Sequence, residues 1–433
     1  MQTDGPRHDP FAALRQPSFV LYSLDRGMSA IAASVLQLTM AWQVLEISGS
    51  VSNAALNLGF LALARFLAAL ATSLAGGVVA DAFDRRLIMV FSKTVPLTCA
   101  CILGVATLGD WVQLELIFGL VILTGFASSF EGPARQALLP ALVRPETFAN
   151  AVTVANMIQR LGGITGPIVA GFVISATGIA ASYFIVMAAL LASTVPLLLL
   201  RYPQPTGKRA GANIQAALEG LKFVRSQQPV LGAMSLDMFA TIFGGAAALL
   251  PIYASDILDV GPTGLGVLTA SMSAGAYASS LLMMFRPAVR RTGRVLVSCV
   301  VLYGLLTVAF GFSREFILSV LLYGLIGGVD MVSIVMRQQI IQMATPNELR
   351  GRVSAVYQVF LGASNQGGAM ESGFVAAATS ATFAVVSGGF AAAAIAGFIG
   401  WRMPRLFHYE SGDEAPGDAS PAPAAQAASA AGR

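Results

Sequence analysis

The 433-residue sequence has little charge and almost no histidine, and these shortages exclude several classes of protein. Charged residues make up 11% of the chain, less than half the share of about 25% in ordinary soluble domains. The two histidines are His8 and His408, one in each polar end segment, which excludes a histidine-based triad, zinc site or proton relay in the apolar body. The sequence also lacks a Gly-x-x-x-x-Gly-Lys-Ser/Thr phosphate loop and a His-Glu-x-x-His pair. We therefore expect neither an enzyme nor a protein with a cofactor or bound metal.

Cysteine and net charge are scarce as well. The three cysteines, Cys99, Cys101 and Cys299, fall inside apolar runs, so a disulfide scaffold is excluded. The net charge of +4 is small and scattered, which argues against a nucleic-acid partner. What remains is a largely apolar chain, in which 56% of the residues are hydrophobic.

Apolar runs long enough to cross a bilayer fill most of the sequence. A membrane-spanning helix needs about 20 mainly apolar residues, whereas a β-barrel shows shorter alternating segments. Twelve such runs are found, near residues 19–45, 54–76, 87–108, 112–132, 150–175, 180–200, 230–254, 264–285, 295–312, 316–338, 353–378 and 381–401. We therefore predict an all-α membrane protein with twelve transmembrane helices, embedded in the lipid bilayer.

Arginine and lysine are distributed unequally between the two sets of loops. The loops on one side hold Arg85, Arg86, Arg135, Arg144, Arg201, Lys208, Arg209, Lys222, Arg225, Arg286, Arg290, Arg291, Arg294, Arg350, Arg352, Arg402 and Arg405. The other side contributes Arg314 alone and the acids Glu46, Asp110, Glu115, Asp256, Asp259 and Glu315. Since Lys and Arg accumulate on the cytoplasmic side, we predict a multi-pass protein of the cell (inner) membrane with both termini in the cytoplasm.

The predicted helices fall into two sets of six, separated by a long polar loop. The expected segments are a cytoplasmic N-terminal segment (1–18), an N-terminal six-helix half (19–201), a cytoplasmic linker (202–228), a C-terminal six-helix half (229–402) and a disordered cytoplasmic tail (403–433). In the linker, residues 214–225 place apolar side chains at helical spacing, so we expect an amphipathic helix on the membrane surface. The tail is rich in Ala, Pro and Ser, a composition that cannot build a core.

The two halves repeat each other. Gly125, Arg135, Gln136 and Glu146 recur 202 positions later as Gly327, Arg337, Gln338 and Glu348. Leu24-Asp25 in the first predicted helix is echoed by Leu236-Asp237 in the seventh. Parallel six-helix repeats are typical of transporters whose site lies at the interface of the halves, which predicts two pseudo-symmetric halves around a substrate site.

Several stretches resemble the major facilitator superfamily of transporters. The segment Gly77-Val-Val-Ala-Asp81-Ala-Phe-Asp-Arg85-Arg86 resembles its signature loop, with Asp where the broad pattern has Gly before the basic pair. Residues 42–46, 133–140, 345–352 and 371–373 are similar to the enterobactin-exporter and macrolide-efflux branch, so the resemblance covers nearly the whole membrane body. A degenerate form of the antiporter motif of the superfamily's exporters is found at Gly162, Gly166, Pro167 and Gly171. The resemblance implies the major facilitator fold and an exporter of small molecules.

These motifs also have physical interpretations. Gly77 allows close approach of two helices, and Asp81 can pair with a basic residue or cap a helix, which would latch a cytoplasmic gate. The alternative is an ordinary positive-inside loop. Gly162 and Gly166 allow tight helix contact and Pro167 can kink the fifth span, but close packing alone explains them as well as gating does.

Charges inside the predicted helices carry most of the functional signal, because a charge at the helix centre is costly. The acids Asp25, Asp237, Glu371 and Asp330 are candidates for proton coupling, with Asp25 and Asp237 preferred. One interpretation is that a carboxylate exchanges an arginine partner for a proton during turnover. The other is that the charges form static ion pairs that hold the halves together.

The remaining candidates would line a substrate cavity: Arg26, Arg65, Arg160, Phe239, Phe243 and Met272. The arginines favour an anionic or catecholate cargo and the acids a cationic drug, and the sequence leaves both open. We expect a secondary active exporter, working by alternating access as a proton antiporter and as a monomer. The alternatives are an importer or uniporter of the same fold, a subunit of a primary pump, and a receptor or scaffold that transports nothing.

Overall fold

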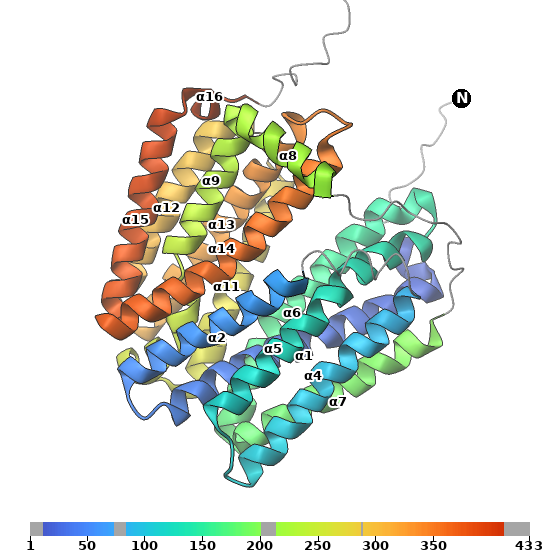
Figure 1. Cartoon of the computed structure of the whole chain (residues 1–433), viewed down its shortest axis with the longest axis vertical. Helices are drawn as coiled ribbons and strands as arrows, with labels where there is room; N and C mark the ends of the chain where they lie inside the picture. The colour runs from blue at the N-terminus through green and yellow to red at the C-terminus, as the bar shows by residue number, and fades with distance from the viewer. Residues whose placement is uncertain (1–11, 73–83, 201–213, 287–288, 411–433) are drawn as a thin grey trace, which may run out of the picture.

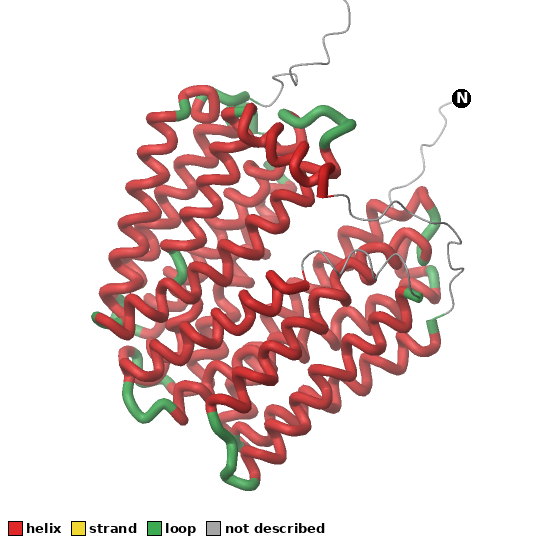
Figure 2. The backbone as a smooth tube through the Cα atoms, in the orientation of Figure 1, coloured by secondary structure: helices red, strands yellow, loops and turns green. Residues whose placement is uncertain are grey.

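The computed structural model describes residues 12–72, 84–200, 214–286 and 289–410, and the described residues form helices and connecting loops without strands (Figures 1 and 2). Twelve of the described helices are long. Eleven stretches are long and apolar enough to cross a membrane. The exception among the long helices is α14 (Arg350–Ala378), which carries polar side chains along its length, including Asn365, Gln366 and Glu371.

The first half contains six long helices. They are α1 (Pro17–Ile47), α2 (Val51–Thr72), α4 (Arg85–Leu108), α5 (Leu114–Leu138), α6 (Phe148–Thr177) and α7 (Ile179–Leu199). Short helical turns flank them at η1 (Ala12–Arg15), η2 (Leu139–Ala141) and η3 (Pro145–Thr147). Gly178 separates α6 from α7 at φ +92°, a backbone conformation that glycine adopts without steric cost, so the chain reverses there in one residue.

The second half repeats this arrangement. Its long helices are α9 (Gln228–Phe243), α11 (Gly261–Met284), α12 (Thr292–Phe312), α13 (Phe316–Met343), α14 and α15 (Ala381–Arg402). The expected single helix at 230–254 is broken: α9 ends at Phe243, and η4 (Ala246–Leu249), α10 (Leu250–Ile252) and the π-helical turn η5 (Tyr253–Ile257) continue it. The break falls at Gly244 and Gly245, where the backbone packs against Tyr303 of α12 and Gly368 of α14.

The two halves meet mainly through two helix pairs, α2 with α14 and α6 with α11. A β-carbon placed on Gly373 would lie 2.5 Å from the Cα atom of Gly59, so side chains larger than hydrogen are excluded between α2 and α14. At the second pair, a β-carbon on Gly266 would lie 2.4 Å from the carbonyl oxygen of Pro167. Close backbone contact of this kind is how small residues join helices in membranes.

Hydrogen bonds between the halves gather at the ends that are predicted to face outward. Ser52 donates to the carbonyl oxygen of Ala377 at 2.9 Å, and the hydroxyl oxygens of Ser175 and Thr263 lie 2.7 Å apart. Toward the opposite end, where α8 (Ile214–Ser226) and α16 (Pro404–Phe407) lie, the two groups of helices diverge (Figure 1). The halves are thus joined at the predicted outer end and separated at the predicted cytoplasmic end.

Two segments outside the spans are described. The expected helix of the linker is present as α8, with Val224 buried in the apolar cluster of the second half and Glu219 paired with Arg352 of α14, and its position on the membrane surface stays a prediction. Residues 403–410 belong to the segment expected to be disordered, yet they are ordered, because Leu406 and Tyr409 are buried against the start of α12. Residues 411–433 of that tail lie outside the described part of the chain.

Candidate transport site

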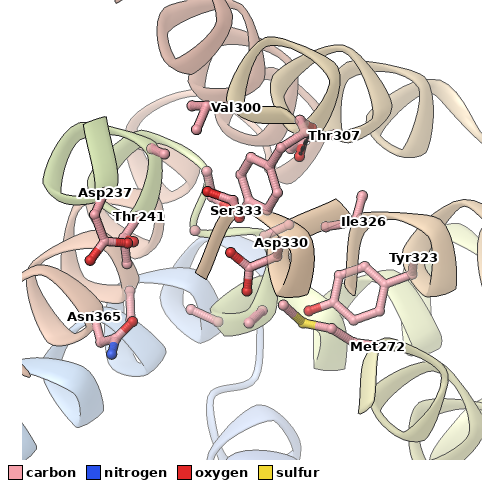
Figure 3. A pocket seen from close by; sticks show the side chains of 18 of the residues that line it. Asp237, Thr241, Met272, Val300, Thr307, Tyr323, Ile326, Asp330, Ser333 and Asn365 are labelled. Atoms are coloured by element: carbon pink, nitrogen blue, oxygen red, sulfur yellow. Dashed lines mark hydrogen bonds between the residues drawn. The ribbon is translucent and has the colours of Figure 1, made fainter. Parts of the chain in front are cut away.

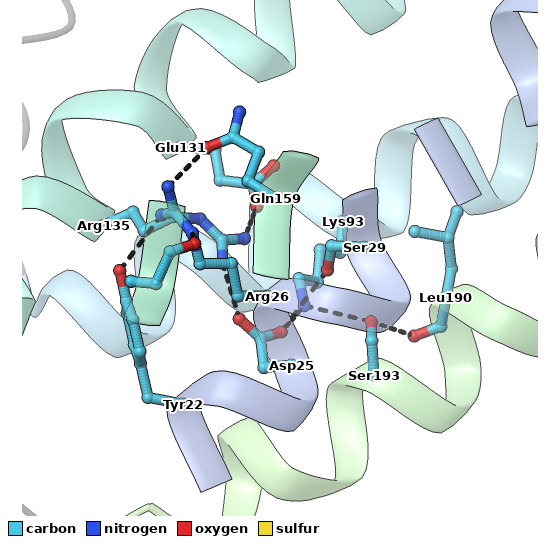
Figure 4. A network of polar contacts seen from close by, with 11 residues as sticks. Tyr22, Asp25, Arg26, Ser29, Lys93, Glu131, Arg135, Gln159, Leu190 and Ser193 are labelled. Atoms are coloured by element: carbon cyan, nitrogen blue, oxygen red, sulfur yellow. Dashed lines mark hydrogen bonds and ion pairs between the residues drawn. The ribbon is translucent and has the colours of Figure 1, made fainter. Parts of the chain in front are cut away.

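A buried carboxylate in the first half is held by two cations (Figure 4). Asp25 of α1 is fully buried, and its Oδ2 atom accepts a hydrogen bond from Nη1 of Arg135 at 2.9 Å. Lys93 of α4 donates to the other oxygen, Oδ1, and also to the hydroxyl of Ser193 at 3.0 Å. Arg135 also pairs with Glu131, one turn earlier in α5. Two acids and two bases therefore balance each other within one half.

The neighbouring Arg26 is satisfied by uncharged acceptors. Its Nε donates to the carbonyl oxygen of Ala155 at 2.7 Å, and its Nη atoms donate to Tyr22 and to Gln159 (Figure 4). Arg26 and Arg135 line a cavity of about 630 Å³ between α1, α5 and α6. This cavity lies on the side where the halves diverge.

The second half repeats the acid–arginine contact. Asp237 of α9 accepts a hydrogen bond from Nη1 of Arg337 in α13, with 2.8 Å between Oδ1 and Nη1. Nε of Arg337 donates to the hydroxyl of Tyr357 at 2.9 Å. Arg337 is 2% exposed, so this ion pair is withdrawn from bulk water. A buried ion pair with an additional hydrogen bond is the arrangement in which a charge is tolerated inside a membrane protein.

Asp237 and Asp330 point into one small cavity, which has a volume of about 150 Å³ (Figure 3). Thr241, Ser333 and Asn365 add polar groups to its wall. Within the described part of the chain, Asp330 makes no hydrogen bond or ion pair, whereas Asp237 has Arg337. Arg337 also lines this cavity, so the two carboxylates face one arginine, which Asp237 contacts directly.

The sequence analysis did not recognise the two arginines of these pairs as site residues. Arg135 was counted with the cytoplasmic loops, and Arg337 fell at the end of the predicted span 316–338 without being assigned a role, but both lie within helices, α5 and α13. The signal was present, because both arginines belong to the 202-residue repeat and both aspartates to a repeated Leu-Asp pair. Lys93 belongs to no repeat, and its charge inside the apolar run 87–108 was the signal available for it.

A larger cavity of about 440 Å³ lies between the halves. Helices α1, α2 and α6 of the first half and α11, α13 and α14 of the second contribute to its wall, together with η4 and α10. Arg65 and Met272, two of the residues predicted to contact substrate, line it. Cavities of this volume match drug-sized ligands.

The other predicted cavity residues lie elsewhere. Arg160 donates to Sδ of Met331 at 3.1 Å, across the two halves. Phe239 and Phe243 stack on each other with ring centroids 6.4 Å apart, and Phe239 packs against the apolar cluster of the second half. Neither phenylalanine is among the residues that line the cavities described above, so their predicted contact with substrate stays a prediction. Glu371 lies beside Ser372, 3.4 Å from its hydroxyl, and is likewise outside those cavities.

Part of the predicted gating loop can be placed. Arg85 donates to the carbonyl oxygen of Ala137 at 2.7 Å, and Arg86 donates to carbonyl oxygens of Leu198 and Leu200. Both arginines thus satisfy carbonyl groups at the ends of helices in the first half. Gly77 and Asp81 lie outside the described residues, so their predicted role stays a prediction.

The antiporter-like motif faces two different partners. Gly162 and Gly166 pack against Ala30 and Ser34 of α1, within the first half. Gly171 instead lies against the backbone of Pro262 in α11, and Pro167 contacts Gly266 of the same helix. Close packing therefore explains all four positions, and the last two lie where the halves meet.

Comparison with known proteins finds relatives of this chain among transporters. The family model described as transmembrane secretion effector matches residues 8–432. The enterobactin exporter EntS of Escherichia coli O81 (strain ED1a) is 24% identical over 348 residues, which cover 79% of this chain and 81% of the exporter. These residues span most of both chains.

Solved structures share the fold at low sequence identity. A bacterial homologue of the human lysosomal transporter Spinster, in an inward-facing and occupied conformation, has a TM-score of 0.67 at 12% identity and covers 92% of this chain and 97% of its own. The nucleoside transporter NupG has a TM-score of 0.66 at 14% identity, covering 90% and 99%. At these identities the likeness concerns the fold alone.

Proposed function

Because this chain belongs to the transmembrane secretion effector family of the major facilitator superfamily, it is a multi-pass membrane transporter and not an enzyme, and we propose that it exports small amphiphilic molecules in exchange for protons. The protein works as a monomer in the cell membrane, with both termini in the cytoplasm. The proton gradient supplies the energy, and no cofactor takes part. Its cargo is of the siderophore or drug type.

The observation that carries this proposal is the acid–arginine pair in each half, Asp25 with Arg135 and Asp237 with Arg337. A carboxylate can bind a proton, whereas a guanidinium in a protein stays charged. Protonation of Asp25 cancels its attraction for Lys93 and Arg135, so proton binding changes the contacts between α1, α4 and α5. A ligand that binds one arrangement better than the other shifts the balance between conformations, which is how a proton can drive alternating access.

The location of the ion pairs supports rocking of the halves. Asp25, Lys93 and Arg135 belong to one half, and Asp237 and Arg337 to the other. These pairs therefore do not fasten the halves together, and proton coupling requires that rocking also repack α1 against α5, or α9 against α13, so that the acid binds its proton more tightly in one arrangement than in the other. Pairs that bridged the halves would instead resist the motion that alternating access requires.

The direction of transport is inferred from the cavities and the loop charges. The 630 Å³ cavity lies toward the end where the halves diverge, and the arginine-rich loops place that end in the cytoplasm. A cavity on this side lets cargo bind from the cytoplasm, which is the first step that an exporter requires. A curated relative with a named activity is an exporter, which favours the same direction.

Transport into inverted membrane vesicles tests the proposal. In these vesicles the cytoplasmic face is outside, and respiration acidifies the lumen. Fluorescein and rhodamine 123 serve as probes, because they share one ring system and carry opposite charge. We expect uptake of one of them that requires respiration, is abolished by a protonophore and does not require ATP. Uptake that survives the protonophore, or that depends on ATP, contradicts proton antiport.

The alternatives predict different results. A uniporter equilibrates the probe without concentrating it, and an importer releases probe from loaded inverted vesicles when the lumen is acidified. A receptor or scaffold gives no difference between vesicles with and without the protein. A deletion strain tested for siderophore secretion and for drug susceptibility then identifies the class of natural cargo.

A further inference from the structure

Arg65 of α2 is the one charged side chain among the described residues that line the 440 Å³ cavity between the halves. The other polar groups of the wall are uncharged hydroxyls and amides: Ser34, Gln37, Thr269, Ser273, Tyr323, Asn365 and Gln366. The remaining wall is apolar and includes Leu58, Leu61 and Met272. The cavity is therefore amphiphilic and carries a single positive charge.

Arg65 differs from the other cations of the transport site in its partners. Lys93, Arg135 and Arg337 each contact a carboxylate, and Arg26 contacts carbonyl, hydroxyl and amide oxygens. Within the described ranges, the guanidinium of Arg65 has no hydrogen-bond or ion-pair partner. Arg65 also lines a second cavity, of about 200 Å³, with Lys93 and Glu131, but Glu131 pairs with Arg135. Because arginine keeps its charge in proteins, an anion that enters the 440 Å³ cavity can supply the partner that Arg65 lacks among the described residues.

The acids do not offset this charge in the same cavity. Asp25 and Asp237 are held by their own cations and are not among the residues that line it. Asp330 lies in the adjoining 150 Å³ cavity, which shares Met272, Tyr323 and Asn365 with the larger one. The larger cavity thus favours a negatively charged ligand.

We infer that the central cavity binds an organic anion whose carboxylate, sulfonate, phosphate or phenolate oxygens contact the guanidinium of Arg65. Guanidinium groups bind such oxygens through two parallel hydrogen bonds. The amides and hydroxyls of the wall receive the polar remainder of the molecule, and Leu58, Leu61 and Met272 contact its apolar body. As a substrate site, this assignment rests on the proposed transport function and narrows its cargo to anions.

The inference has a consequence for energetics. Exchange of one monovalent anion moving out for one proton moving in carries two positive charges inward, whereas exchange of a monovalent cation for a proton carries none. An inside-negative membrane potential therefore drives export of an anion even without a pH gradient, at about 2.3 kcal/mol per charge per 100 mV.

Binding is tested by fluorescence anisotropy of fluorescein and of rhodamine 123 with the full-length protein in lipid nanodiscs. We expect fluorescein to bind, and Arg65→Gln to raise its Kd by about tenfold or more. Arg65→Lys keeps the charge but loses the paired donors, so its Kd should lie between the two. Arg314→Gln, at the predicted outer surface, is the matched control and leaves binding unchanged.

The outcomes separate this inference from the proposed function. No fluorescein binding up to about 1 mM, equal affinity in wild type and Arg65→Gln, or binding of rhodamine 123 alone overturns the inference, whether or not the protein transports. Binding that depends on Arg65 without transport driven by a gradient supports the anion site and contradicts the exporter. In vesicles, a potassium–valinomycin potential at equal pH should drive fluorescein in wild type and not in Arg65→Gln.

Discussion

Asp237 is held by Arg337 at 2.8 Å in the second half, as Asp25 is held by Arg135 at 2.9 Å in the first. The two contacts join equivalent helices of the two halves, α9 with α13 and α1 with α5. Each pair stays within its own half, so these charges do not fasten the halves together. The first pair differs from the second by an additional cation, Lys93.

Neutralising the coupling acid should separate driven transport from exchange. We expect Asp25→Asn to abolish pH-driven transport while cargo exchange across the vesicle membrane remains measurable, because proton binding resets the empty carrier and cargo can replace that step in exchange. Asp237→Asn is assayed in parallel. Full pH-driven activity in both variants would show that neither residue carries the proton, and Glu371 and Asp330 become the acids to test.

The stability of the same variants distinguishes coupling from a structural role. Asp25→Asn leaves Lys93 and Arg135 without their carboxylate, and breaking a buried pair costs about 3–5 kcal/mol. The double variant Asp25→Asn/Lys93→Met restores the charge balance, with Arg135 still paired to Glu131. We expect the double variant to regain thermal stability and to remain uncoupled. Recovery of pH-driven transport with stability would assign Asp25 a purely structural role.

Crosslinking the predicted outer ends should trap one conformation. The hydroxyl oxygens of Ser175 and Thr263 lie 2.7 Å apart across the halves, which places cysteines at these positions close to disulfide geometry. In a background without Cys99, Cys101 and Cys299, oxidation of Ser175→Cys/Thr263→Cys should stop transport, and reduction should restore it.

A matched pair within one half provides the control for this crosslink. The hydroxyl oxygens of Thr39 and Ser182 are also 2.7 Å apart, but both residues belong to the first half. Oxidation of Thr39→Cys/Ser182→Cys should form a disulfide, detected by mass, and leave transport intact. Equal inhibition by both disulfides would contradict movement of the halves as units.

A methyl group at the α2–α14 contact should weaken the joined outer end. A β-carbon on Gly373 would lie 2.5 Å from the Cα of Gly59, so Gly373→Ala forces the helices apart at a cost of about 1–3 kcal/mol. We expect slower turnover and a lower crosslinking yield at Ser175→Cys/Thr263→Cys. Gly367→Ala, in the same helix with open space around its β-carbon, should leave both measurements unchanged.

The sequence predicted the helices better than the site, for a physical reason. Apolar length defines a spanning helix, so eleven of the twelve runs reappear as apolar spans and the twelfth as α14. Arg135 was missed because α5 continues past its most apolar stretch, and an arginine near a helix end is counted as a loop charge by the positive-inside rule. Arg337 stands at the end of the predicted span 316–338, where the sequence gives an arginine no visible partner. Whether such an arginine faces an aspartate on a distant helix depends on tertiary packing.

Packing also decides the surroundings of single residues. Phe239 has the size and apolar character of a cavity residue, and it packs against the apolar cluster of the second half, a contact that the sequence does not show. Two large side chains, Leu406 and Tyr409, do not predict an ordered structure in a tail rich in alanine and proline. Both are nevertheless buried, because they pack against the start of α12. The sequence does not show that Arg65 has no ion-pair partner among the described residues, because this depends on which side chains of other helices surround its guanidinium.

The polarity of α14 has a consequence for how the protein is made. This helix carries Arg350, Arg352, Asn365, Gln366 and Glu371, and is not apolar enough to qualify as a span by itself. A segment of this kind partitions poorly into lipid when it leaves the ribosome alone. Its polar face is accommodated only after earlier segments, above all α2, can pack against it. Integration of α14 into the bilayer is therefore expected to wait for the helices that cover its polar face, which makes it a late step of biogenesis.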